Sequence, residues 1–157
     1  MKKKLMTLLL LAAALMLALT PVLAENPAED WVADSVEGTS WQDDRASLEV
    51  EIPADGNGYL VRIMWGSSAW EHTEWLYTCS YNEETKILTA SHLVCDEVAY
   101  DEDGTETRIS KIDVDCETTF SLNEEGKVVI TNAADETLEG KTFTRVPDTY
   151  DSGEAVG

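Results

Sequence analysis

The chain has little positive charge and few of the residues that build metal centres. Its 157 residues include 11 Lys and Arg against 31 Asp and Glu, and only 2 His. The formal net charge of −20 argues against binding to nucleic acid or to anionic lipid, because such polyanions repel the chain. The two histidines, His72 and His92, are too few and too scattered for a zinc centre.

Cysteine is also scarce. Cys79, Cys95 and Cys116 allow at most one disulfide and leave one thiol over. Their spacing lacks the close pairs of a zinc site. Free cysteines are also common as small apolar core residues, so the pairing among these three stays open. Nothing in the sequence predicts a cofactor.

Long apolar runs are absent except at the N-terminus. Lysines at residues 2–4 precede an apolar run over residues 5–19, and small residues allow a cut between Ala24 and Glu25. This pattern predicts a secretory signal peptide over residues 1–24. The run is nearly long enough for an uncleaved membrane anchor, but Pro21 and the cleavage pattern favour removal. Glu25 is not a cysteine and offers no site for a lipid anchor. We therefore expect a secreted protein with no membrane insertion after cleavage.

The remaining chain is short enough for one domain. We expect a single β domain over residues 25–146, with its core in 41–146, and a flexible acidic tail over 147–157. Five Trp and five Tyr, with many Val and Ile, supply the core that a disordered acidic chain lacks.

Helical periodicity is lacking after residue 24, although residues 28–36 are compatible with one short helix. A period of two dominates instead, as in Ser47-Leu48-Glu49-Val50-Glu51-Ile52. The apolar phase slips between Ile109 and Ile112, which predicts a β-bulge. The expected strands cover residues 47–52, 59–65, 73–81, 87–91, 95–100, 105–114, 118–122, 127–131 and 141–146.

Turn-forming residues separate these strands. Asn, Asp and Gly gather in residues 53–58, 82–85, 101–104 and 123–126. Such short connections join antiparallel neighbours. We therefore predict an all-β fold: an antiparallel up-and-down meander of about eight strands that forms a closed or partly closed barrel, because closure removes exposed edges.

No recognisable catalytic set is present. Ser67 and Ser68 precede His72, but a nucleophile elbow needs flanking glycines and a strand–turn–helix setting. The acidic residues 101–104 stop short of a calcium loop and are typical of a turn. A carboxylate pair for hydrolysis is a further alternative that no particular residues support. We expect no metal site and no enzymatic activity.

Aromatic residues are concentrated in residues 65–81. Trp65 and Trp75 lie on the inward phases of adjacent strands, and Trp70 lies in the connection between them. These rings either fill the core or line a ligand site, and a barrel of about eight strands has room for either arrangement. The core is favoured for Trp75, whereas Trp70, outside the strand alternation, is compatible with both roles. If the binding site lies at that mouth of the barrel, we expect Trp70 to be a recognition residue.

Arg62 has the opposite phase to Val61 and Ile63. It either pairs with an acidic group of a ligand or counters Glu49 or Glu51 on the neighbouring strand. The candidate ligand-binding residues are therefore Trp65, Trp70, Trp75 and Arg62.

The same region carries a family resemblance. Residues 65–81 resemble the motif Trp-(Gly/Ala)-Ser-Ser-Ala-x-Glu-x-Thr-x-Trp-x-(Tyr/Phe)-x-Cys-x-Tyr of uncharacterised secreted all-β proteins from gut-dwelling Gram-positive bacteria, and the similarity extends over about residues 41–146. It implies a single secreted domain and transfers no activity. In architecture the meander is similar to lipocalin-like barrels, which often carry Gly-x-Trp near the first strand; residues 38–41 read Gly-Thr-Ser-Trp, one residue longer.

Two functions fit these observations. The first is a non-catalytic binding domain for an unknown small ligand or protein partner, acting as a monomer. The alternative is a secreted inhibitor of a cationic hydrolase such as a lysozyme, since the negative charge would speed association with a basic enzyme. A deep cavity would favour the ligand, whereas a filled core with a protruding acidic loop would favour the inhibitor.

Overall fold

The computed structural model describes residues 30–146, so the predicted signal peptide (1–24) and acidic tail (147–157) lie outside the described residues. The described part is almost entirely antiparallel β-structure, which confirms the predicted fold class. The elements are α2 (Trp31–Val36), β1 (Trp41–Asp43), β2 (Ala46–Glu51), β3 (Tyr59–Gly66), β4 (Glu71–Asn82), β5 (Ile87–Tyr100), β6 (Glu106–Asp115), β7 (Thr119–Leu122), β8 (Val128–Thr131), the 3₁₀ turn η2 (Glu136–Leu138) and β9 (Thr142–Arg145).

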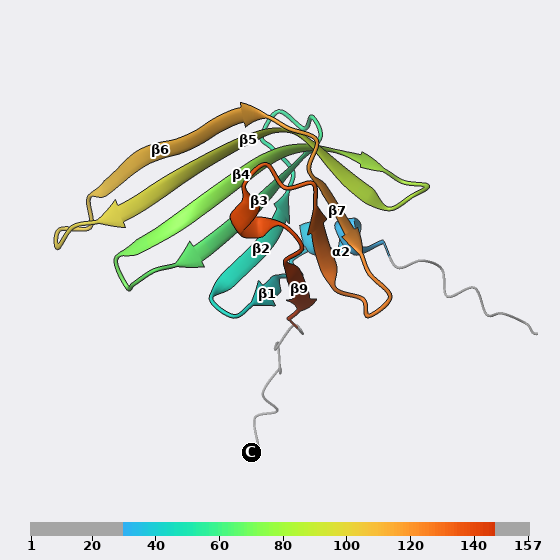
Figure 1. Cartoon of the computed structure of the whole chain (residues 1–157), viewed down its shortest axis with the longest axis horizontal. Coiled ribbons are helices and arrows are strands. Elements are labelled where there is room, and N and C mark those ends of the chain that lie inside the picture. The colour runs from blue at the N-terminus through green and yellow to red at the C-terminus, as the bar shows by residue number, and fades with distance from the viewer. Residues whose placement is uncertain (1–29, 147–157) are drawn as a thin grey trace, which may run out of the picture.

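Eight of the strands close into a barrel. The hydrogen-bonded order is β4-β3-β2-β1-β9-β8-β7-β5, and β4 also pairs with β5, which completes the ring. The ninth strand, β6, pairs with β5 outside this ring. In Figure 1, β3 to β6 run together to one side, well beyond the short strands β7 and β9. The barrel is therefore closed over only part of the length of its longer strands.

β5 explains this uneven length. The predicted strands 87–91 and 95–100 are one continuous strand of 14 residues, because a register shift opposite Thr78 and Cys79 absorbs the change in apolar phase. The first part of β5 pairs with β7, and the second part pairs with β6 on the same edge. Two backbone hydrogen bonds bridge the junction, from the N–H of Cys116 to the Ser91 oxygen (3.1 Å) and from the N–H of Ala90 to the Thr118 oxygen (2.8 Å). β6 and β7 thus follow one bent path along β5.

The predicted bulge lies within β6. Cys95 pairs with Ile112 and Asp96 pairs with Ser110, so Lys111 is the extra residue. This shift brings Ile109 and Ile112 to the same face despite their spacing. The prediction from the slipped apolar phase is confirmed.

The predicted turns are confirmed as well. The side-chain oxygens of Asn82, Asp101 and Asn123 each accept two backbone N–H groups from the turns that they open. Gly58 precedes β3 with φ +73°, and a Cβ there would lie 2.7 Å from the Cys79 carbonyl oxygen. The turn before β3 therefore requires glycine for both conformation and space.

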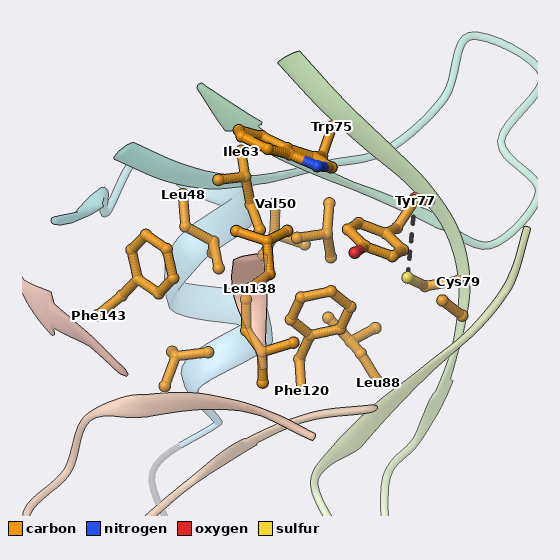
Figure 2. Packing of buried hydrophobic residues seen from close by; sticks show 14 of the residues in the cluster. Leu48, Val50, Ile63, Trp75, Tyr77, Cys79, Leu88, Phe120, Leu138 and Phe143 are labelled. Atoms are coloured by element: carbon orange, nitrogen blue, oxygen red, sulfur yellow. Dashed lines mark hydrogen bonds between the residues drawn. The ribbon is translucent and has the colours of Figure 1, made fainter. Parts of the chain in front are cut away.

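Large side chains fill the barrel interior. Figure 2 shows Leu48, Ile63, Tyr77, Phe120 and Leu138 converging on one space. All five are buried, and Tyr77 stacks edge-on against Phe120 with ring centroids 5.2 Å apart. Buried side chains therefore form a packed core inside the barrel.

Short elements cover the two ends of the barrel. Asp30 caps α2, which was expected over residues 28–36 and is observed as Trp31–Val36. Trp31 is buried and donates its indole N–H to the Lys86 oxygen (2.9 Å) in the β4–β5 turn. At the other end, Leu138 of η2 is completely buried in the barrel. Neither η2 nor β1 was expected from the sequence, because both are too short to show a period.

Candidate functional site

The part of the sheet that extends beyond the barrel frames a groove. This sheet extension consists of residues 71–76 of β4, 94–100 of β5 and 106–115 of β6. Its inner face carries two adjoining pockets of about 280 and 360 Å³, which share Ser67, Thr73 and Glu97. We call the two pockets together the groove. Their remaining lining residues are Glu71, His72, Val98, Ala99, Thr107 and Ile109 in one pocket, and Trp65, Trp75, Cys95, Lys111, Ile112, Asp135 and Thr137 in the other.

Strand register explains why these side chains meet. Trp65, Thr73, Glu97 and Ile109 are successive cross-strand neighbours on β3 to β6. The next inward row holds Trp75, Cys95 and Ile112. Because strand residues alternate between the two faces of a sheet, both rows project on the same face. The groove is a consequence of the pairing that also closes the barrel.

Trp75 and Asp135 form the floor of the groove. Trp75 is 4% exposed, and its indole N–H donates to Asp135 Oδ2 at 2.8 Å. Burial alone raises the pKa of Asp135, but hydrogen bonds from Thr137 and Trp75 outweigh it and hold that pKa below its ordinary value. The ionised carboxylate caps η2 through the N–H of Thr137 (2.9 Å). Trp75 thus ties the 3₁₀ turn to the sheet beneath the groove.

The side walls contain polar pairs. Lys111 Nζ lies 2.9 Å from Glu97 Oε2, which joins β6 to β5 at the bulge. Lys141 Nζ lies 4.5 Å from the ring centroid of Trp65, a cation–π contact on the barrel side. The groove therefore combines aromatic and aliphatic surface with charged groups.

Exposed apolar side chains gather on and beside the sheet extension. In the described chain the large hydrophobic residues classed as exposed are Ile52, Trp70, Tyr100, Ile109 and Val114. All except Ile52 belong to β5, β6 or the β3–β4 connection. Ile109 is 54% exposed and Val114 is 41% exposed, although both project on the inner face of the sheet. Clustered apolar exposure of this kind marks interaction surfaces.

Trp70 lies at the tip of the sheet extension. The backbone N–H of Trp70 donates to Ser68 Oγ (3.1 Å), and its backbone carbonyl accepts the backbone N–H of Tyr100 (2.8 Å). The first bond lies within the β3–β4 connection, and the second holds this connection against the β5–β6 hairpin. The indole is 58% exposed, which agrees with the expectation that Trp70 is not a core residue. The acidic turn 101–104 follows Tyr100 directly.

Arg62 lies on the opposite face from the groove. Its guanidinium pairs with Glu51 (2.8 Å) and with Glu74, so the predicted pairing with a neighbouring-strand acid is present. Arg108 pairs with Glu74 from the other side. Burial raises the pKa of Glu74, but hydrogen bonds from Arg108 and Arg62 outweigh it and the net pKa lies below 4.5. These ion pairs link β2, β3, β4 and β6 on the outer face of the sheet.

The four candidate residues therefore have three different locations. Trp65 and Trp75 line the groove together, Trp70 stands at the tip beside it, and Arg62 is turned away. Sequence reasoning missed Lys111, Asp135 and Thr137. Residues 132–141 show no alternation, so no sequence signal placed Asp135 and Thr137 against Trp75.

Within the described residues, Ser67, Ser68 and His72 do not form a hydrogen-bonded set. Ser68 Oγ accepts from Trp70 and His72 stacks on Tyr100, and no hydrogen bond joins His72 to Ser67 or Ser68. The three cysteines are free; burial raises the pKa of Cys79 to about 12 and that of Cys95 to about 11, which keeps both thiols protonated at neutral pH. Across residues 30–146 no group of three or more His, Cys, Asp or Glu residues is placed to hold a metal ion. The same residues include no helix long and apolar enough to cross a membrane.

No protein-family model, curated protein or solved structure matches the chain. The function of the groove therefore has to be argued from its own geometry and chemistry.

Proposed function

We propose that this chain is a secreted, non-catalytic binding domain that holds its ligand in the groove beneath the sheet extension. The observation that carries the proposal is the exposure of two apolar side chains on the inner face of β6: Ile109, which lines one of the two adjoining pockets, and Val114, which projects farther along the same face. In a barrel with no partner such side chains would be expected in the core, as Leu93 and Cys95 are on the neighbouring strand. A ligand in the groove would remove this apolar area from water.

The shape of the site favours a segment of a protein over an enclosed small molecule. The barrel interior is packed with side chains such as Tyr77 and Phe120. A further pocket of about 300 Å³ between α2 and β2 has no exposed large apolar side chain in its lining, which makes the groove the better place for a ligand. The pocket lined by Trp65 and Trp75 is the more open of the two, whereas sites for small molecules usually surround most of the ligand. Aromatic anchors beside polar groups, as with Trp65, Trp75 and Glu97, are common at protein interfaces.

The test is a binding screen read by backbone amide NMR shifts. The panel comprises linear peptides, sugars, peptidoglycan fragments, bile-type amphiphiles and basic hydrolases. We expect the compounds that bind to shift the amides of groove residues such as Thr73 and Glu97. Shifts confined to the outer face around Arg62 and Leu76 would contradict the proposal, as would a panel that moves no groove amide.

A matched pair of variants sharpens this screen. Ser67 lines both pockets, whereas its neighbour Ser68 lines neither, and both are exposed. Ser67→Trp should fill the groove and weaken binding at least about tenfold, roughly the loss expected when one buried apolar contact is blocked. Ser68→Trp adds the same side chain outside the pockets and should bind normally. Equal effects from the two variants would place the ligand elsewhere.

Export is the part of the proposal that rests on residues 1–24. A cut after Ala24 predicts an exported protein that begins at Glu25. Intact mass or N-terminal sequencing of the exported form measures this directly. A membrane-bound product that retains residues 1–24 would contradict it.

A second candidate is the inhibitor of a cationic hydrolase, and the tip of the sheet extension favours it. The exposed indole of Trp70 and the acidic turn 101–104 project together beyond a filled barrel. Exposed tryptophans are frequent binding anchors, and negative charge speeds encounter with a basic enzyme.

Enzyme inhibition tests this second candidate. We expect the protein to slow a basic lysozyme, and the double variant Glu102→Gln, Asp103→Asn to slow association several-fold at low salt. The control Glu83→Gln, Glu84→Gln removes the same charge from the exposed β4–β5 turn at the other end and should act normally. Full enzyme activity in the presence of excess protein would rule this candidate out for that enzyme class.

A further inference from the structure

We propose that the free edge of β6 binds an extended, basic segment of a partner protein as an added β-strand, whose alternate side chains enter the groove. This inference rests on the proposed function and specifies the partner. It is carried by the unpaired edge of β6, by the apolar side chains beside that edge and by the charge of the chain.

The edge of β6 is long and open. β6 is the last strand in the sheet order, pairs with β5 along its whole length, and has 10 residues. Within the described residues no strand pairs with its other edge. Every second residue there presents an N–H and a C=O group that another strand can pair with. Partner peptides use such edges in strand addition.

The barrel has a place for the added strand. β7 continues the path of β6 along β5, and β8 pairs with β7 over Val128–Thr131. β8 is too short to reach β6, which leaves the position next to β6 empty of any described strand. A strand bound to β6 would lie at the position that β8 occupies beside β7. It would complete the barrel wall along the sheet extension.

Side chains next to this edge favour apolar contacts on one face of the added strand. Ile109, Ile112 and Val114 project from β6 on the inner face, and two of them are exposed. Strand side chains alternate, so every second residue of the added strand would point into the groove and the others into solvent. The partner segment should therefore alternate apolar and polar residues.

Charge favours a basic partner over a second copy of this chain. Arg108 and Lys111, the basic residues of β6, already pair with acids of their own chain. Asp113 and Asp115 contact only the imidazole of His92 (3.0 and 3.1 Å) among the contacts described for them, and both carboxylates stay largely exposed. Glu71 adds a carboxylate to the groove. Basic side chains opposite these acids stabilise cross-strand pairs. Two copies that each carry a net charge of −20 repel one another.

The bulge at Lys111 restricts which strands can pair. It interrupts the regular edge between Ser110 and Ile112. Bulges and edge lysines are devices that prevent unspecific edge-to-edge aggregation. We therefore expect β6 to pair selectively with strands that accommodate the bulge, and not to aggregate nonspecifically with other strands.

The experiment uses synthetic peptides of about ten residues, matched to the length of β6, in which lysine alternates with valine, isoleucine, tyrosine or threonine. We expect members of this panel to slow amide hydrogen exchange at β6 residues whose N–H groups face away from β5. Counterparts with glutamate in place of lysine should bind at least about tenfold more weakly. The inference is overturned if no basic peptide slows exchange in β6, or if the acidic panel binds equally well.

Backbone methylation of the peptide separates strand addition from other binding modes. In an added strand, alternate N–H groups point to opposite edges. N-methylation of one alternate set of residues should abolish binding, while methylation of the other set should be tolerated. Binding that survives both modifications would overturn strand addition.

A matched pair of isoleucines provides the protein-side control. Ile109 and Ile52 are both 54% exposed, so neither substitution should disturb the core. Ile109→Ser should weaken binding of the basic peptide about tenfold, and Ile52→Ser should leave it unchanged. A ligand that shifts groove amides without protecting β6 would leave the proposed function standing and refute this inference. Concentration-dependent dimerisation through β6 in the absence of peptide would instead identify a second copy as the occupant and would also refute it.

Discussion

Trp75 joins the core to the groove, so its truncation tests both at once. The side chain is 4% exposed, lies on the floor of the groove and donates to Asp135 at 2.8 Å. Trp75→Ala removes the indole from the contact between β4 and η2. We expect a large loss of stability with the rest of the sheet pairing unchanged.

The magnitude follows from two contributions. Truncation of a large buried aromatic residue costs about 3–5 kcal/mol in the free energy of unfolding. The lost hydrogen bond adds no more than about 1 kcal/mol, because Asp135 is only half-buried in the groove floor and can regain water. The total of about 3–6 kcal/mol is a large fraction of the roughly 5–15 kcal/mol that stabilises an ordinary domain. The variant should be only marginally folded.

Urea unfolding followed by circular dichroism measures the loss. Trp75→Phe serves as the intermediate variant, since it keeps an aromatic ring and removes the N–H; it should cost about 1–2 kcal/mol. Asp135→Asn preserves a capping oxygen for η2 and completes a double-mutant cycle with Trp75→Phe, for which we expect a coupling of about 1 kcal/mol. A loss below about 1 kcal/mol for Trp75→Ala would refute the inward placement of this strand face.

Three further variants test other parts of the structure. Trp70→Ala should change stability by less than about 1 kcal/mol, because the indole is exposed, and a larger loss in urea unfolding would place the ring in the core. Tyr77→Phe should be neutral or stabilising by up to about 1 kcal/mol, because the buried Tyr77 hydroxyl has no protein hydrogen-bond partner in the described chain; a clear loss would reveal a partner. The lowered pKa of Glu74 means that its ionised form stabilises the fold above pH 4.5, and that this contribution disappears as the pH falls through the folded-state pKa. Glu74→Gln should therefore cost about 2 kcal/mol at neutral pH and flatten the acid limb of the stability curve, whereas an unchanged acid limb would show that the pairs with Arg62 and Arg108 contribute nothing.

Alternation and turn chemistry made most of the fold predictable. Each strand with a clean period of two, such as β2, was expected within a residue or two of its observed bounds. The bulge at Lys111 was predictable because the apolar residues on either side of it, Ile109 and Ile112, differ in strand phase. By contrast, the single strand β5 was expected as two, since the sequence does not show that a register shift keeps both parts paired with β4.

The candidate site was only partly predictable. Trp65 and Trp75 share a strand phase, and the structure brings both to the groove. Arg62 lies between the buried residues Val61 and Ile63, yet its strand phase turns it to the other face, where it pairs with Glu51 and Glu74. The contributions of Asp135 and Thr137 depend on a loop that crosses the end of the barrel, and no local pattern encodes such a tertiary contact. The free edge of β6 likewise depends on the length of β8.

The most direct test of the account is a high-resolution crystal structure of the protein with the strongest-binding peptide or compound from the binding screen. We predict density for the ligand in the groove, in contact with Trp65 or Ile109, with Leu138 still buried in the barrel end. Ligand density inside the barrel, with Leu138 and Phe120 displaced, would contradict the account.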